Sequence, residues 1–438
     1  MLITNIILPT VYCLLFTYFT WKNFSWGLYL FFFLLPTYLI RFNIGPLPTT
    51  LLEVMLWIII VIWFVKFNKN IIPKIKSLIT DHWLLFIGVA FFILASTISI
   101  FISTDTRSAL GEWKAFYIEP TLLFIILITN YQLLITKKEN FVNNIIFALI
   151  LSGFLTSLLA IYQHLTGWLV PYAFWQNQNT FRVTAWYGFP NAVGLFLAPL
   201  IPLILFLIIH EWNKIKQKNW LLLICYLLFA ICYLMAIIYS KGTGPLIGLI
   251  SGIGLLLLFY KKTRWITVVV GIIGILSLFS LSSLSGLKNE VLLRDRSGQI
   301  RLSIWNETWQ FLKDNPISGA GLASYSEKIK SYHTTVNGEG IEIFHHPHNI
   351  FLTMWVNLGL LGLVSFTGIL ISLFLIPYSL FKKHIKMPNI RFFLIASLTT
   401  IIITGLVDSP YIKNDLSVLF WLLPALLIIT DDQSKHSV

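Results

Sequence analysis

A cluster of histidines at the edge of the one long polar stretch of this chain is the first place where chemistry could occur. It reads His345-His346-Pro347-His348-Asn349 and directly precedes an apolar segment that starts at residue 350. Backbone N–H groups at such a helix start favour an anionic substrate, and a neutral imidazole there can accept a hydroxyl proton. The cluster therefore predicts a general base, His348, at a membrane–water boundary, with Asn349 beside it.

The same histidines allow two other interpretations. His345, His346 and His348 could bind zinc together with His333, but adjacent histidine side chains point apart, and the sequence has neither a His-Glu-x-x-His pattern nor a cysteine pair. They could also form an incidental surface turn. Phosphate-binding and dinucleotide-binding glycine patterns are absent as well. We expect no metal and no cofactor.

Arg301 is the first candidate for holding an anionic group. It lies four residues before Trp305, which is one helical turn, and Trp305, Trp309 and Leu312 fall on one helical face. The stretch therefore predicts an amphipathic helix at the membrane surface, broken at residues 314–316, Asp-Asn-Pro. The planar fork of arginine suits a diphosphate, although a solvated charge or a lipid-phosphate anchor would look the same in sequence.

Two further cations and one carboxylate lie near the ends of apolar runs. Lys241 stands in a tight turn, and Arg182 stands in an aromatic-rich connection that leads into Gly188-Phe189-Pro190-Asn191. Asp408 lies in an external turn, where we expect it to pair with a cation of the long polar loop. Ionisable residues at membrane depth are functional candidates by default, with structural ion pairing as the alternative for Asp408.

The elements that must position these residues are membrane helices. Of the 438 residues, 57% are hydrophobic and 11% are charged, where a soluble domain carries about a quarter charged residues. Because a span needs about 20 apolar residues, the apolar runs predict 12–13 spans. The predicted fold is an all-α polytopic transmembrane bundle with one long external loop that contains short amphipathic helices. Its predicted parts are an N-terminal bundle (1–284), the loop (285–349) and C-terminal helices (350–438).

The distribution of basic residues orients this bundle. The net charge is +13, but most lysines and arginines occupy one set of alternating short loops, which the positive-inside rule assigns to the cytoplasm. The 285–349 loop, Arg182 and Lys241 then face the outside. No basic soluble domain is long enough to bind nucleic acid, so we expect no nucleic-acid partner.

Short motifs around the external loop resemble the O-antigen ligase/polymerase superfamily. They are Arg301-x-x-x-Trp305, Pro316-x-x-Gly319-x-Gly321, Pro347-His348-Asn349, Gly359-x-x-Gly362, Gly188-Phe189-Pro190-Asn191 and Ser240-Lys241. Together they cover roughly residues 180–375, and the span pattern extends the resemblance over the whole chain.

The resemblance implies transfer of a glycan from an undecaprenyl-diphosphate carrier to an acceptor hydroxyl, without metal or nucleotide sugar. It implies that His348 is the base and that Arg301 binds the carrier diphosphate. Lys241 stands where the family usually has arginine, so it would supply a point charge where arginine supplies a fork. Arg182 is a third candidate for the diphosphate.

The predicted function is that of an inverting membrane glycosyltransferase, with O-antigen ligation to lipid A–core favoured. A polysaccharide polymerase and a protein O-oligosaccharyltransferase are the alternatives, and a lipid-linked glycan flippase is the alternative from another class. The expected partners are the lipid-linked glycan donor, a lipid-linked or glycan acceptor, and membrane lipids. The expected location is the bacterial inner (cytoplasmic) membrane, with the active site facing the periplasm or exterior.

Overall fold

The described residues are mainly helical with almost no sheet, which confirms the predicted all-α fold. A computed structural model describes residues 2–45, 47–130, 138–178, 180–214, 219–336, 339–376 and 389–435. Basic residues of the predicted cytoplasmic loops, such as Lys137, Lys216 and Lys382, lie outside the described residues, as does the end of the predicted span 350–380.

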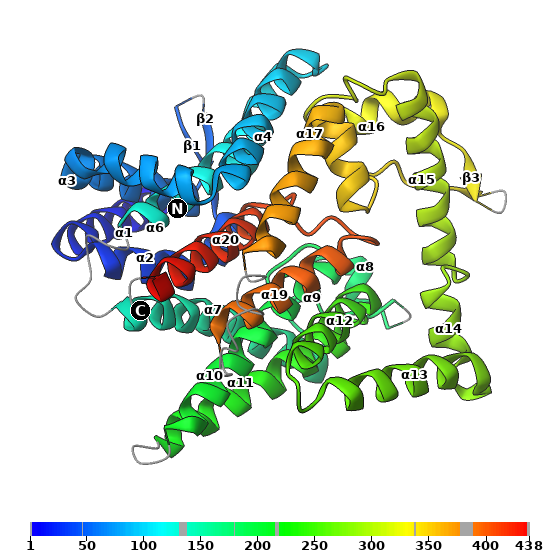
Figure 1. The fold of residues 1–438 in the computed structure, drawn as a ribbon. Helices are drawn as coiled ribbons and strands as arrows, with labels where there is room; N and C mark the ends of the chain where they lie inside the picture. Colours follow the sequence, from blue (N-terminus) through cyan, green and yellow to red (C-terminus); the bar gives the residue numbers. More distant parts are fainter. Residues whose placement is uncertain are drawn as a thin grey trace. The chain divides into compact units, whose positions relative to one another are not determined.

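The chain folds into two compact units whose segments alternate along the sequence. The first unit comprises Met1–His82, Ile118–Pro245 and Lys413–Val438, and the second comprises Trp83–Tyr117 and Leu246–Ile412. Each unit thus draws helices from distant parts of the sequence (Figure 1).

The first unit is a helical bundle in which α20 packs on α6, while α2 and α11 pack on α7. Its helices are α1 (Leu2–Lys22), α2 (Phe24–Phe33), α3 (Leu51–Asp81), α6 (Glu119–Asn130), α7 (Lys138–Thr166), α8 (Ala173–Gln176), α9 (Asn191–Leu197), α10 (Ile201–Asn213), α11 (Trp220–Tyr239) and α20 (Asn414–Lys435). The short 3-10 helices are η1 (Leu35–Leu39) and η3 (Ala198–Leu200), and β1 (Arg41–Ile44) pairs antiparallel with β2 (Leu47–Thr50).

The second unit is built around the packing of α17 on α4. Its helices are α4 (Trp83–Ile102), α5 (Thr106–Glu112), α12 (Thr243–Phe259), α13 (Arg264–Ser280), α14 (Ser285–Val291), α15 (Arg296–Asp314), α16 (Tyr325–Lys328), α17 (Ile350–Leu375) and α19 (Ile390–Thr404). The π-helix η2 (Trp113–Ile118), the 3-10 helices η4 (Ser282–Leu284) and η5 (Ile329–Tyr332), and the antiparallel pair β3 (Thr335–Val336) and β4 (Glu339–Gly340) complete it.

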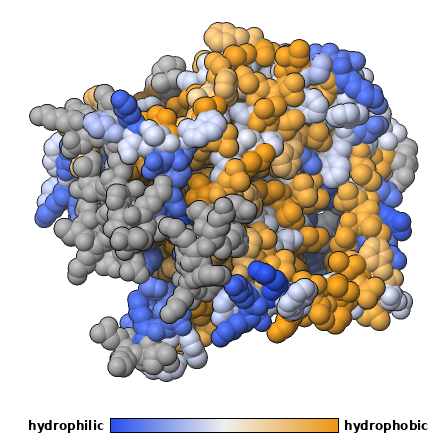
Figure 2. Space-filling model, viewed as in Figure 1, coloured by the Kyte–Doolittle hydropathy of each residue, from blue (hydrophilic) through white to orange (hydrophobic). Residues whose placement is uncertain are grey.

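Six described helices are long and apolar enough to cross a bilayer, and a bent pair, Arg264–Ser280 with Ser282–Asp314, could add a seventh. Other predicted spans are shorter in the structure: α2, α12 and α19 have 10–17 residues each. Pro36 follows α2 and Gly405 follows α19, so these apolar runs do not continue as straight helices. Figure 2 shows apolar side chains over much of one face, with hydrophilic residues gathered over α15 and α16.

The long polar loop forms a small hydrophobic core together with Val356 of α17. The core residues are Phe311, Leu312, Ala320, Tyr325, Ile329 and Val356. Helix α15 ends at Asp314, before Pro316, as predicted. Its buried apolar residues are Ile304, Phe311 and Leu312, whereas Trp309 is 46% exposed. Of the three residues predicted to share one face, Trp305, Trp309 and Leu312, only Leu312 is buried in this core.

One glycine of each motif, Gly319 and Gly359, lies where the loop docks into a break in α17. At Gly359 the backbone has φ 69° and ψ −173°, a conformation that is open essentially to glycine alone. The freed groups bond to the loop: Leu360 N–H donates to Ile317 O (3.0 Å), and Ala320 N–H donates to Val356 O (2.7 Å). A Cβ atom on Gly359 would collide with Ile317 O.

A second set of contacts ties the loop to α4 and α5. The Lys328 ammonium donates to Ile102 O (3.1 Å) and Ala320 O (2.8 Å), and Glu112 accepts a hydrogen bond from Ala323 N–H (3.0 Å). Burial raises the pKa of the Glu112 carboxyl to about 7, and the hydrogen bond from Ala323 opposes that rise. The loop is thus held by α17 on one side and by α4 and α5 on the other.

Close helix approach also explains the small residues of α12. A Cβ atom on Gly248 would lie 2.7 Å from Thr400 O, and one on Gly252 would lie 2.5 Å from Ala396 O. Both glycines therefore let α12 and α19 pack closely, as small-xxx-small spacing predicts.

The break in α17 leads to a stability prediction with a control in the same helix. We expect Gly359→Ala to lower the free energy of unfolding by about 2 kcal/mol or more, because alanine must adopt a strained φ and displace Ile317. Gly368→Ala, where a Cβ meets open space, should change it little. Thermal unfolding in detergent micelles measures both, and equal midpoints for the two variants would refute the packing argument.

Candidate functional site

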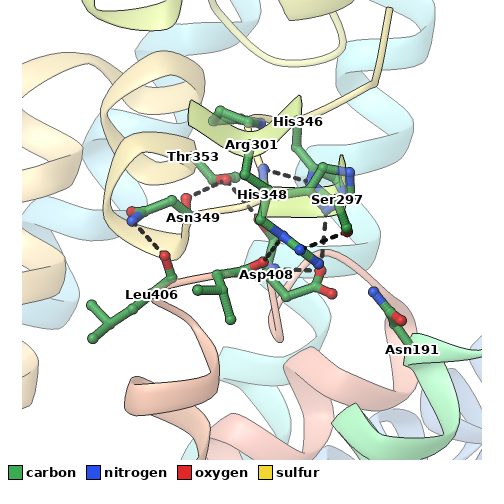
Figure 3. Close-up of polar contacts among 12 residues, drawn as sticks. Asn191, Ser297, Arg301, His346, His348, Asn349, Thr353, Leu406 and Asp408 are labelled. Atoms are coloured by element: carbon green, nitrogen blue, oxygen red, sulfur yellow. Dashed lines mark hydrogen bonds and ion pairs between the residues drawn. The ribbon is translucent and has the colours of Figure 1, made fainter. Parts of the chain in front are cut away.

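The site of the second unit is organised by the turn that follows α19, residues 405–409. Each residue of this turn bonds to a residue outside it. Three backbone carbonyl groups accept hydrogen bonds: Gly405 O from Ile350 N–H (2.7 Å), Leu406 O from the Asn349 side chain (3.0 Å) and Val407 O from Arg301 Nε (2.8 Å). Two side chains complete the set: Asp408 lies 3.4 Å from His348, and Ser409 bonds to Thr353 (2.8 Å). One short turn therefore positions most of the residues singled out from the sequence (Figure 3).

His348 is held in a strained backbone conformation directly before α17. Its φ is +48°, which few residues other than glycine adopt, and its N–H lies 3.4 Å from His346 Nδ1, a long hydrogen bond. The rings of Phe344 and His346 contact its ring edge-on, with centroids 4.8 and 4.6 Å away. The backbone and its neighbours thus define where the imidazole points.

Asp408 defines the tautomer of His348. The His348 Nδ1 atom lies 3.4 Å from Asp408 Oδ1, and since a carboxylate only accepts, the neutral imidazole carries its proton on Nδ1 and leaves Nε2 as an acceptor. Burial alone would raise the pKa of the Asp408 carboxyl. The hydrogen bond from His348, the positive charges of His348 and His346 when they are protonated, and the Ser409 N–H (2.8 Å) outweigh burial and hold that pKa below its usual range.

Asn349 caps α17 and ties it to the turn. Its Oδ1 accepts hydrogen bonds from Phe351 N–H (3.0 Å) and Leu352 N–H (3.1 Å), while its Nδ2 donates to Leu406 O (3.0 Å). An asparagine fits this position because it both caps a helix and donates a hydrogen bond. The cap places His348 immediately outside the first turn of α17, as predicted.

Arg301 and Trp305 connect α15 to the same site. Arg301 donates from Nε to Val407 O (2.8 Å) and from Nη1 to Ser297 Oγ (2.8 Å). Of its five N–H donors, these two bonds leave three for an anionic ligand. One turn later, Trp305 Nε1 donates to Pro347 O (2.9 Å), next to His348. α15 therefore holds the guanidinium and also supports the backbone before the imidazole.

Arg182 and Lys241, the other two predicted diphosphate residues, belong to the first unit. Arg182 donates to Ser240 O (2.8 Å), to Lys241 O (3.0 Å) and to Asn191 Oδ1 (3.0 Å). Its guanidinium also lies 5.5 Å from the centre of the Trp175 ring. Lys241 is exposed and has φ +51°. The structure thus joins these two cations to each other in one turn.

His333, considered above as a zinc ligand, has different partners. Its Nδ1 lies 3.2 Å from Glu307 Oε2 and its Nε2 lies 2.9 Å from Ile341 O, so it fastens the β3–β4 segment to α15. Glu307 also accepts from the backbone N–H of Thr334 (3.0 Å). Within the described ranges, no group of three or more His, Cys, Asp or Glu side chains is placed to hold a metal ion.

Several residues of the site were not predicted from the sequence. The carbonyl groups of Leu406 and Val407 act through the backbone, which any residue type supplies. Ser297 was identifiable in principle, because it lies four residues before Arg301 on one helical face. The buried Glu307, which holds His333 and Thr334, was not recognisable among the other loop carboxylates.

Comparison with known families agrees with these observations. Residues 228–367 match the family model described as O-antigen ligase, and this segment includes Lys241, Arg301 and His348. The match confirms the predicted resemblance to the O-antigen ligase/polymerase superfamily. No curated protein matches the chain. The apolar helices indicate a multi-pass membrane protein, and the matched segment supports ligase/polymerase-type membrane glycan transfer at family level.

The pairing of Asp408 with His348 predicts the effect of neutralising the carboxylate. We expect Asp408→Asn to lower kcat for glycan transfer about 100-fold, because the tautomer and orientation of His348 are no longer fixed.

The same variant tests the contribution of Asp408 to stability. Since the pKa of Asp408 is depressed in the folded protein, its ionised form stabilises the fold above about pH 4, and this stabilisation is lost as the pH falls. Thermal midpoints of wild type and variant should therefore differ at pH 7 and converge in acid, and an unchanged kcat would exclude the pairing from the reaction.

Proposed function

We propose that this O-antigen ligase-type chain transfers a glycan from an undecaprenyl-diphosphate carrier to an acceptor hydroxyl on the external face of the cytoplasmic membrane. The observation that carries the proposal is the 405–409 turn, which bonds both to a histidine–carboxylate pair and to an arginine. A base for a hydroxyl and a fixed cation for a departing diphosphate are the two requirements of such a transfer.

The proposed reaction is a single displacement. As the acceptor oxygen attacks the anomeric carbon, its proton passes to Nε2 of His348, and Asp408 stabilises the imidazolium that forms. The bond between the anomeric carbon and the diphosphate oxygen breaks, and the leaving diphosphate keeps the electron pair. Attack from the opposite face inverts the anomeric centre.

Arg301 is proposed to neutralise the diphosphate as it departs. Its Nε and Nη1 atoms are anchored by Val407 O and Ser297 Oγ, both at 2.8 Å, so the guanidinium is preorganised and loses little freedom when it binds an anion. Lys241 and Arg182 are proposed as further cations for the carrier diphosphate. Trp305 and Asn349 position the base and do not react.

Ligation to lipid A–core is the favoured activity. Polymerisation of repeat units and transfer to a protein hydroxyl use the same donor and the same base, so the acceptor separates the three. A flippase would move the lipid-linked glycan across the bilayer without any acceptor, and it would need no base at His348.

Reconstitution with a purified lipid-linked oligosaccharide tests the proposal directly. Wild-type protein in vesicles should transfer glycan to one of three acceptors: lipid A–core, a second lipid-linked repeat unit, or a protein. His348→Ala should retain donor binding and lose transfer by at least about 100-fold, because proton transfer to a positioned base contributes that much or more. His210→Ala, at the end of α10, is the control that should keep full activity. Full transfer by the His348 variant, or acceptor-independent translocation by wild type, would overturn the proposal.

A further inference from the structure

A turn of three residues in the first unit, 239–241, lies beside Arg182 and beside a histidine, His164, that was not among the predicted site residues. Tyr239 ends α11, Ser240 caps it and Lys241 follows, before α12 begins at Thr243. Lys241 has a left-handed backbone with φ +51°, and its side chain is exposed. In the part of the chain that the structure describes, no residue hydrogen-bonds or pairs with its ammonium group.

Arg182 fastens a second cation to this turn. Its guanidinium donates to the carbonyl oxygens of Ser240 (2.8 Å) and Lys241 (3.0 Å), and it stacks near the Trp175 ring at 5.5 Å. These contacts hold a guanidinium next to Lys241.

His164 contributes a third basic group through Tyr239. In the last turn of α7, its ring stacks parallel on the Tyr239 ring, with centroids 3.6 Å apart and an interplanar angle of 7°. A parallel stack leaves the in-plane nitrogen atoms at the ring edge available for hydrogen bonds. No described residue occupies those nitrogens.

The position of His164 is defined by the residue before it. Gln163 is fully buried, and its Oε1 accepts from the N–H groups of Thr184 (3.0 Å) and Ala185 (2.8 Å). α7 is thereby fixed to the segment that carries Arg182. His164 and Arg182 consequently reach the 239–241 turn from two elements that are tied to each other.

We propose that His164 is a donor-binding residue that shares the carrier diphosphate with Lys241 and Arg182. The inference rests on the proposed function, which supplies a diphosphate as part of the donor. Three basic groups are arranged around three consecutive residues, and an anion with several oxygens is the ligand that such a cluster attracts. An imidazole suits one of these positions because it donates an N–H in either protonation state.

Direct binding of a short-chain analogue tests this role independently of turnover. Farnesyl diphosphate is titrated into the purified full-length protein in detergent, with farnesol as the comparison, and binding is followed by calorimetry. His164→Phe keeps the aromatic stack on Tyr239 but lacks the N–H donor, so the fold should be retained. We expect this variant to bind the diphosphate at least about tenfold more weakly, because it loses a hydrogen bond to a charged group and about 1.4 kcal/mol corresponds to tenfold in affinity.

His210→Phe is the matched control, because His210 also stacks on an aromatic ring, that of Phe206, with centroids 5.6 Å apart. It should bind as wild type does. Equal affinity of the His164 variant and wild type, or no preference of wild type for farnesyl diphosphate over farnesol, would overturn the inference. If wild type binds the diphosphate but transfers glycan to no acceptor, the proposed function fails and the anion site stands.

Discussion

The hydrogen bonds of the turn at 405–409 are the constraint on which the rest of the candidate site depends. Five consecutive residues each bond to α17, to its N-terminal cap Asn349, to His348 before that cap, or to α15. Because Val407 and Asp408 are adjacent, the peptide chain itself sets the spacing between the arginine and the histidine that they contact. Neither Arg301 nor His348 could move without breaking bonds in this turn, so both are preorganised for chemistry that develops charge.

The break in α17 is a second constraint of the same kind, because hydrogen bonds to the loop hold it. A broken helix in an apolar environment frees backbone N–H and C=O groups that water does not reach, and each unsatisfied group costs several kcal/mol. Here the freed groups near Gly359 are taken up by Ile317 O and Ala320 N–H of the external loop. The break therefore requires the loop, and the loop is placed by the break. α17 begins beside His348, and the loop contains α15, which carries Arg301. The docking of the loop on α17 therefore also helps to fix the position of Arg301 relative to the imidazole.

Residue types and short spacings predicted a large part of this arrangement. Asn349 as the cap before an apolar run, the end of α15 before Pro316, and the four-residue spacing of Arg301 and Trp305 are local features, and the structure contains each of them. What local spacing could not predict is the set of contacts made by backbone carbonyls, such as Val407 O, or between helices far apart in sequence, such as His164 on Tyr239. Trp309 shows a further limit, because helical periodicity predicts which residues share a face and not which face is covered. Gly319 and Gly359 were visible as parts of two motifs, but only the docking of the loop on α17 explains their positions.

The central claim is that His348 deprotonates an acceptor hydroxyl that displaces the carrier diphosphate in one step, without a covalent glycosyl intermediate. The most direct test is the configuration of the new glycosidic bond, determined by NMR on product made from a lipid-linked donor of known anomeric configuration. A single displacement predicts inversion at the anomeric carbon. Retention of configuration would require two successive displacements through an enzyme nucleophile, and it would contradict the assignment of His348 as the base of a direct transfer.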